Sequence, residues 1–254
     1  MKWTAFGKTD PGKKRANNED ALLLNHELGL YAVADGIGGS EGGEVASRIA
    51  VETLAKAMPD LLNEKDRTLP AERARTDDPS ISALREAVFL ANRAIDQKRS
   101  QDPGRSNMGT TLTTLLLRDK QAFIAHIGDS RAYLFREGKL VQLTDDHSFV
   151  AEQVRAKTFT LEQARSSPFR HMITRALGIA EEAKADLLNH ALEKDDRFLL
   201  CTDGLTEMVP DAELGRFLAT SSSPQDTVRK LLDAANERGG VDNITAVVVW
   251  VTEV

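Results

Sequence analysis

Short apolar runs alternate with longer amphipathic stretches along the chain, and this pattern predicts a protein of mixed strands and helices. Apolar or β-branched residues fill short segments between turn-forming residues, as strands require, at 3–8, 21–25, 30–34, 108–117, 121–127, 131–135, 139–143, 198–201 and 244–251. Apolar residues at helical spacing favour helices over 43–58, 80–98, 149–155, 160–165, 211–219 and 224–238. Because several strands follow one another through tight connections, we expect antiparallel pairing rather than parallel crossovers.

Individual residues mark where some of these elements begin or turn. Glu137-Gly138 lies between two predicted strands and indicates a hairpin. Ser80 or Ser82 is the expected N-cap of the second predicted helix. The charged, proline-containing segment 63–79 is expected to be an exposed connection within one domain.

Composition excludes several classes of protein. The chain has 254 residues, of which 41% are hydrophobic and 28% are charged, as in ordinary globular proteins. A net charge of −6 without a basic block argues against a nucleic-acid binder. The start lacks the apolar core of a secretory signal, and no apolar stretch is long enough to span a bilayer. We therefore expect a cytoplasmic protein that binds neither nucleic acid nor membrane.

Two reactive side chains have alternative interpretations at this point. Cys201 is the only cysteine, so an intramolecular disulfide and a thiolate metal cluster are excluded. Its apolar strand predicts an inert, structural thiol, whereas its closeness to Asp203 leaves a redox-sensing role open. His147 precedes a predicted helix, where it is a metal ligand, an acid or, as the position favours, a polar cap residue.

The first chemical signal is an Asp-Gly pair that follows the apolar run 30–34. Asp35 comes directly after this predicted buried strand, and Gly36, Gly38 and Gly39 allow a sharp turn. A carboxylate and the neighbouring Gly36 carbonyl are hard oxygen ligands of the kind that Mg²⁺ or Mn²⁺ prefers. An ordinary strand-to-helix turn is the alternative, while a dinucleotide-binding loop is excluded because a glutamate stands where its third glycine belongs.

Aspartates at the ends of apolar strands recur along the chain. Asp129 and Asp203 also follow apolar strands, and Asp242 immediately precedes one. In antiparallel sheets the exit of one strand lies beside the entry of its neighbour, so these carboxylates are expected at one end of the sheets with Asp35. Clustered carboxylates repel one another unless cations lie between them, and oxygen ligands select Mg²⁺ or Mn²⁺ over zinc.

A further acidic pair follows an arginine near the start of the chain. Arg15 can bind a phosphate through two hydrogen bonds, while Glu19 and Asp20 can face metal-bound waters. Together with the recurring aspartates, these residues indicate metal-assisted hydrolysis of a phosphate ester.

These residues lie in eight motifs that resemble, in order, those of the metal-dependent serine/threonine protein phosphatases, the PPM or type 2C family, in its compact bacterial form. The motifs are Arg15-x-x-Asn18-Glu-Asp20, Val33-Ala-Asp-Gly-Ile-Gly-Gly39, Met108-Gly-Thr-Thr111, Gly128-Asp-Ser-Arg131, Leu143-Thr-Asp-Asp-His-Ser148, Thr174-Arg-Ala-Leu-Gly178, Cys201-Thr-Asp-Gly-Leu205 and Asp242-Asn-Ile-Thr245. The resemblance implies an α+β fold in which two packed antiparallel β-sheets are flanked by α-helices on both outer faces. It implies one catalytic domain over 1–254, with a flap subdomain at about 148–173 beside the active site.

The resemblance also implies the metal ligands. Asp35 would bridge two Mn²⁺ or Mg²⁺ ions, and the Gly36 carbonyl would bind one of them. Asp203 and Asp242 would hold the other ion. Asp129, with Asp203, matches the ligands of a third, weaker site.

Other implied roles concern phosphate binding and proton transfer. Arg15 matches the phosphate-binding arginine, and Glu19 and Asp20 would act through waters. The chain departs from the family where some members carry a histidine, because it has Ile37 and Ser40 at those two positions. No proton donor for the leaving group can therefore be assigned by resemblance.

The implied activity is hydrolysis of phosphoserine and phosphothreonine in proteins by a metal-activated water, without a covalent intermediate. A pseudophosphatase that only binds phosphoproteins is the alternative, but it is disfavoured because Arg15 and all the ligand aspartates are present. A small-molecule phosphatase is a third interpretation. The substrates are expected to be those of a cognate Ser/Thr kinase, and the protein is expected to be a monomer.

Overall fold

A computed structural model describes the chain except for residues 39–41, 64–77, 103, 105–106 and 180–182. Gly39, Ser40 and most of the predicted connection 63–79 therefore lie outside the described residues.

The strands of the described chain form two antiparallel sheets. Their bounds are β1 Lys2–Asp10, β2 Asp20–Asn25, β3 Leu30–Ile37, β4 Gly109–Thr110, β5 Leu112–Arg118, β6 Gln121–Ile127, β7 Arg131–Arg136, β8 Lys139–Gln142, β9 Asp186–Ala191, β10 Arg197–Cys201 and β11 Ile244–Glu253. The first sheet has the strand order β1-β11-β10-β7-β8. The second has the order β2-β3-β5-β6-β9, with the short β4 beside β3.

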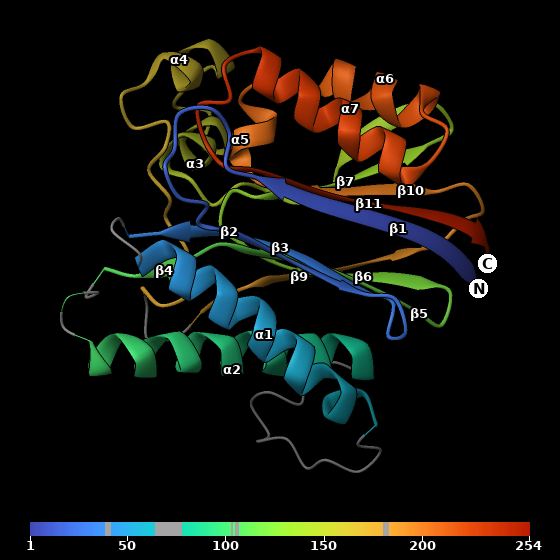
Figure 1. Cartoon of the computed structure of the whole chain (residues 1–254), viewed down its shortest axis with the longest axis horizontal. Coiled ribbons are helices and arrows are strands. Elements are labelled where there is room, and N and C mark those ends of the chain that lie inside the picture. Colours follow the sequence, from blue (N-terminus) through green and yellow to red (C-terminus); the bar gives the residue numbers. More distant parts are fainter. Residues whose placement is uncertain (39–41, 64–77, 103, 105–106, 180–182) are drawn as a thin grey trace.

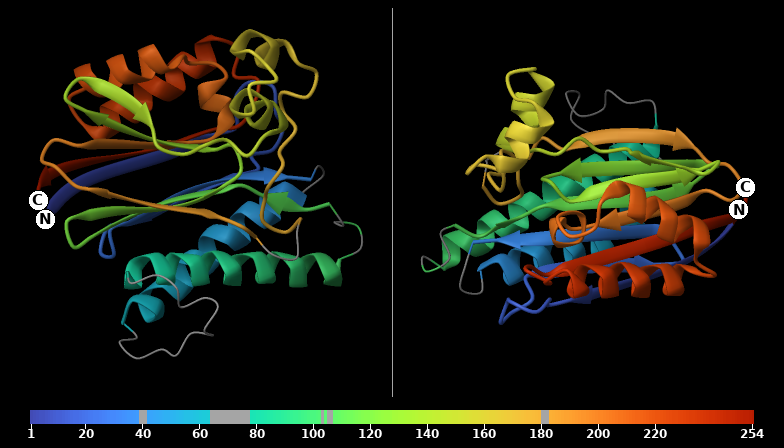
Figure 2. Two further views of the ribbon diagram at one scale, coloured as in Figure 1. Left: turned by 180° about the vertical axis from the view of Figure 1, so that it is seen from behind. Right: turned by 90° about the horizontal axis from the view of Figure 1, so that it is seen from above.

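Helices cover the outer faces of both sheets. Their bounds are α1 Gly42–Asn63, α2 Pro79–Gln101, α3 Phe149–Arg155, α4 Leu161–Ser166, α5 Asp203–Thr206, α6 Asp211–Thr220 and α7 Pro224–Glu237. Helices α1 and α2 lie on the second sheet, and α6 and α7 lie on the first (Figure 1). Helices α3, α4 and α5 gather at one end of the sandwich, and both termini lie at the other end (Figures 1 and 2).

Three apolar layers hold the sandwich together. One packs α1 and α2 on the second sheet, one lies between the sheets, and one packs α6 and α7 on the first sheet. Strand β3 contributes to two of them, because Leu30, Ala32 and Ala34 face the helices while Tyr31 and Val33 face the other sheet. Burial on both faces explains its unbroken apolar sequence. The predicted α+β sandwich is confirmed.

Several local predictions are corrected. The N-cap of α2 is Asp78, not Ser80 or Ser82; Pro79 has no N–H, so the Asp78 carboxylate accepts from the Ser80 N–H at 2.7 Å. Ser148 rather than His147 caps α3, through its hydroxyl and the Ala151 N–H.

Two strand boundaries also differ from expectation. Strand β3 does not end before Asp35 but continues to Ile37, because its last residues pair with β4. Strand β9 was not predicted, since its sequence Asp-Leu-Leu-Asn-His-Ala lacks the alternation of a half-buried strand. It forms by pairing with β6.

Other predictions are confirmed. Glu137 and Gly138 both have positive φ, 51° and 77°, as a tight hairpin between β7 and β8 requires. Cys201 is fully buried, and burial raises the pKa of its thiol to about 12, so the residue is an inert part of the core. Within the described residues, no helix combines the length and apolar character needed to cross a bilayer.

Candidate active site

The predicted acidic residues converge at the end of the sandwich beside α5. Asp20, at the start of β2, and Asp35, near the end of β3, are direct cross-strand partners. Asp203 begins α5 directly after β10, and Asp242 lies just before β11. Because β10 and β11 pair antiparallel, these last two residues come from adjacent strand ends.

Asp20 is held by two buried hydroxyls. The Thr202 and Thr245 hydroxyls donate to its Oδ2 at 2.8 and 2.6 Å. Its Oδ1 is buried without a hydrogen-bond partner among the described residues, and so is Oδ1 of Asp129. Buried carboxylate oxygens are normally satisfied, so these two atoms mark positions where a cation or water is needed.

The carboxyl groups of Asp35 and Asp203 both have raised pKa values. Burial is the largest cause of the raised pKa of both groups, and repulsion between the clustered carboxyls adds to it. The interaction between the two carboxyls raises the pKa of Asp35 further and opposes the rise at Asp203. Burial likewise raises the pKa of Asp20 to about 7 and that of Asp129 well above its ordinary value.

The Thr111 hydroxyl connects Asp35 to the residue that follows Asp129. The Asp35 N–H donates to the Thr111 hydroxyl at 2.9 Å, and that hydroxyl lies 2.8 Å from the Ser130 hydroxyl. Gly128 has φ +112°, and a Cβ there would lie 2.5 Å from Thr111. The turn that presents Asp129 therefore requires glycine.

Close glycine packing brings Glu19 to the site. The backbones of Gly36 and Gly43 are in close contact, so a Cβ on Gly36 would be 2.3 Å from the Gly43 carbonyl. A Cβ on Gly43 would lie 2.1 Å from Oε2 of Glu19. The Glu19 carbonyl accepts from the Gly36 N–H at 3.2 Å and from the Ser47 hydroxyl at 2.6 Å.

Arg15 is paired with an acidic residue of the cluster. One of its terminal nitrogens donates to Asp242 Oδ2 at 2.6 Å, and the arginine side chain is 56% exposed. The guanidinium thus lies at the rim of the site, where it can also reach a bound anion. Here it neutralises Asp242, an ion pair that the sequence did not indicate.

Asn243 anchors the loop that carries Arg15 and Glu19. Its side-chain oxygen accepts from the Glu19 N–H at 2.8 Å, and its side-chain nitrogen donates to the carbonyls of Pro11 and Asn17 at 3.0 and 2.9 Å. Asn243 belongs to the predicted motif Asp242-Asn-Ile-Thr245, but the sequence did not indicate that its side chain holds this loop through three hydrogen bonds.

His171 and Glu207 also lie at the site and were not predicted. His171 Nδ1 is 2.9 Å from Glu207 Oε1, and ligand atoms of both residues and of Asp203 lie within 4.8 Å of one another. His171 belongs to the segment between α4 and β9, and Glu207 follows α5. Nothing in the local sequence indicates this contact, because it joins residues that are remote in the chain.

The residues present fit divalent cations. The cluster offers oxygen donors from several buried or half-buried carboxyls, two of them with an unsatisfied oxygen. Burial is the largest cause of the raised pKa values of the cluster, and the charge of neighbouring carboxyls adds to it; the groups are Glu19, Asp20, Asp35, Asp129 and Asp203. Mn²⁺ or Mg²⁺ between these oxygens would compensate that charge.

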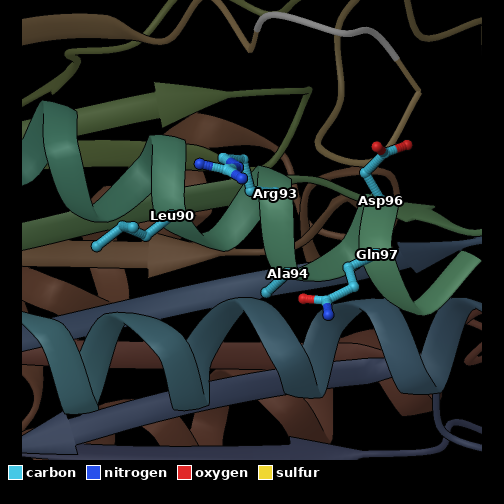
Figure 3. A pocket seen from close by; sticks show the side chains of 5 residues that line it. All are labelled: Leu90, Arg93, Ala94, Asp96 and Gln97. Atoms are coloured by element: carbon cyan, nitrogen blue, oxygen red, sulfur yellow. The ribbon is translucent and has the colours of Figure 1, made fainter.

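A separate hollow of about 420 Å³ lies on the outer helix layer (Figure 3). It is lined on α2 by Leu90, Arg93, Ala94, Asp96 and Gln97. Its charged groups already have partners, because Arg93 lies over the Phe89 ring and Asp96 pairs with Arg99. None of the acidic residues at the sheet ends lines this hollow.

The chain is similar to known protein phosphatases. Residues 12–244 match the family model described as protein phosphatase 2C. The serine/threonine phosphatase stp of Listeria welshimeri is 35% identical over 245 residues, which cover 95% of this chain and 93% of that protein.

Solved structures of this family have the same fold. The serine/threonine phosphatase PstP/Ppp of Mycobacterium tuberculosis superimposes with a TM-score of 0.86 at 34% identity, covering 99% of each chain. The catalytic domain of PstP in complex with two manganese ions gives a TM-score of 0.84 at 34% identity, also covering 99% of each chain. The chain therefore belongs to the protein phosphatase 2C family.

Proposed function

We propose that this protein is a metal-dependent phosphatase that hydrolyses phosphoserine and phosphothreonine in other proteins. The observation that carries the proposal is the cluster of Asp20, Asp35, Asp203 and Asp242 at one end of the two sheets, with Arg15 at its rim. Divalent cations bound there would supply an activated water and would neutralise charge on a phosphoryl group.

Each residue of the cluster has a proposed role. Asp35 and the Gly36 carbonyl, with Asp203 and Asp242, would hold two cations. Glu19 and Asp20 would orient waters around these cations. Two hydroxyls hold Oδ2 of Asp20, and its Oδ1 has no hydrogen-bond partner among the described residues, so Oδ1 is available to bind such a water. Arg15 would leave Asp242 to bind the phosphate through two hydrogen bonds when the cations neutralise that carboxylate.

Asp129 is proposed as a ligand of a third, weaker cation together with Asp203. Its unsatisfied Oδ1 and the raised pKa of its carboxyl support this role. Either Mn²⁺ or Mg²⁺ would serve at these sites, since the proposed ligands are oxygen atoms.

The surroundings of the site suit a protein substrate. Residues 148–173 are proposed to form a flap within one catalytic domain over 1–254, and they include α3, α4 and the site residue His171. We propose that the protein is a cytoplasmic monomer and that its substrates are phosphorylated by a cognate Ser/Thr kinase. A binding-only pseudophosphatase is not favoured, because every proposed ligand and Arg15 are present.

Metal removal and restoration test the proposal. Protein treated with excess EDTA should not hydrolyse a phosphothreonine peptide, and Mn²⁺ or Mg²⁺ should restore turnover because carboxylate sites exchange these ions. Asp35→Asn should stay inactive with either ion, whereas Asp233→Asn, at an exposed position on α7, should behave as the unmodified protein. Full turnover in excess EDTA would refute the metal-dependent mechanism.

A further inference from the structure

His147 is a buried imidazole to which the proposed reaction assigns no role. Its side chain is only 1% exposed. It lies between the Gly128–Asp129 turn and the two ends of the proposed flap, and its ring is 4.8 Å from that of His126.

Two hydrogen bonds tie His147 to the residue before Asp129. The His147 N–H donates to the Gly128 carbonyl at 2.7 Å. The Gly128 N–H donates to His147 Nδ1 at 3.1 Å. Both the N–H and the carbonyl of Gly128 are thus bound to His147, and this fixes the direction in which the chain continues to Asp129.

The same residue is joined to both ends of the flap. The His147 carbonyl accepts from the Thr174 N–H at 2.8 Å, just after the flap ends. At the flap's first residues, the Phe149 N–H donates to the Met172 carbonyl at 2.8 Å, and Ser148 forms a β-bridge with Ile173. The base of the flap therefore closes directly against His147.

The Gly128 contact sets the tautomer of His147. Nδ1 accepts from the Gly128 N–H, so the neutral ring carries its proton on Nε2 and donates to Asp186 Oδ2 at 3.1 Å. Arg175 Nη1 lies 3.3 Å from His147 Nε2 and donates to Asp186 Oδ1 at 3.3 Å. Burial lowers the pKa of His147, which keeps the ring neutral and Nδ1 available as an acceptor.

From these contacts we infer that His147 is a positioning residue that sets the Gly128–Asp129 turn and the base of the flap in one fixed arrangement. The inference rests on the proposed function, because Asp129 and the flap matter only if the acidic cluster is the reaction site. Its essential feature is the acceptor at Nδ1; the Asp186 contact orients the ring but does not touch the turn.

Two substitutions separate these contacts. His147→Asn places an amide oxygen at the position of Nδ1 and can accept from Gly128, but it is too short to reach Asp186. His147→Gln places its amide at the position of Nε2 and keeps a donor to Asp186, but it loses the Gly128 contact. His147→Gln should lower kcat on a phosphothreonine peptide about 10- to 100-fold, as is typical when an outer-shell partner of a site is lost. His147→Asn should restore most of that loss.

A second measurement needs no metal and no activity. In EDTA, the Gly128 amide hydrogen should exchange slowly in the unmodified protein and in His147→Asn, and faster in His147→Gln. Trypsin should cut the flap after the exposed residues Arg155 and Lys157 sooner in His147→Gln than in the other two proteins. If the unmodified protein proves inactive, the proposed function fails, while these two measurements still decide the role of His147.

A control variant is needed to show that lower stability alone does not reduce kcat. Val228→Ala removes two methyl groups from the fully buried core under α7, remote from the flap, and should lower Tm without lowering kcat. Equal kcat losses in His147→Asn and His147→Gln, or a Val228→Ala loss as large as that of His147→Gln, would overturn the inference. Unchanged Gly128 exchange in His147→Gln would overturn it as well.

Discussion

Asp35 lies on β3 of the second sheet and Asp203 follows β10 of the first, yet their carboxyl groups are close enough to affect one another. Burial is the largest cause of the raised pKa of Asp35, and the charge of Asp203 raises it further. Cations that bind between these carboxyls should therefore release protons.

The metal-free protein should lose stability as the pH rises. The pKa of Asp20 is about 7 in the folded protein and 3.8 for an ordinary aspartate, so between these values the folded state binds more protons than the unfolded state. The free energy of unfolding therefore falls as the pH rises through this window. Thermal unfolding in EDTA should give a lower Tm at pH 8 than at pH 5. Excess Mn²⁺ should reduce or reverse the difference, and a Tm that rises with pH in EDTA would contradict it.

Asp35→Asn should separate stability from activity. The amide can donate to Asp203 but carries no ionisable proton, so the metal-free variant should melt above the unmodified protein at pH 8 and close to it at pH 5. Turnover with Mn²⁺ should fall at least about 100-fold, beyond the usual range for outer-shell partners. Asp203→Asn should be comparably inactive. A lower Tm for Asp35→Asn at pH 8 would show that the carboxylates do not repel one another in the folded protein.

Arg15→Ala should impair phosphate recognition without weakening metal binding. The guanidinium contacts Asp242 at the rim, so its removal frees a carboxylate rather than removing a ligand. On a phosphothreonine peptide, kcat/KM should fall about 10- to 100-fold, because a hydrogen bond to a charged group contributes roughly 1.5–3 kcal/mol. Calorimetric titration with Mn²⁺ should show unchanged or tighter binding. An unchanged kcat/KM would place phosphate recognition elsewhere, and Arg15→Lys tests whether charge alone suffices.

Asp129→Ala should distinguish substrates by their leaving groups. With Ile37 in place of a histidine, the leaving serine or threonine alkoxide needs a proton that nitrophenolate hardly needs. The variant should therefore lose much more activity on a phosphothreonine peptide than on p-nitrophenyl phosphate. Equal losses on both substrates would mean that Asp129 serves binding or folding. In that case His171→Ala, at the imidazole beside Asp203, becomes the variant to compare.

The sequence by itself determined most of the strands and helices and which acidic residues belong to the site. Apolar runs and turn residues predicted most strands and helices because spacing along one element decides which face it buries. The recurrence of aspartates at strand ends placed Asp35, Asp129, Asp203 and Asp242 together, since antiparallel strands bring entries and exits side by side. Hairpin signals also act over a few residues, as at Glu137-Gly138.

Only the tertiary structure decided which of these groups touch. Arg15 and Asp242 are 227 positions apart in the chain, and their pairing depends on the loop that Asn243 clamps. The closeness of Asp35 to Asp203 depends on how the two sheets pack, and the His171–Glu207 contact depends on where residues 167–179 lie relative to α5. No local pattern specifies such contacts, because they arise from register and packing between elements that are remote in sequence. For the same reason, only the tertiary structure brings Gly128, Thr174 and Asp186 into contact with His147.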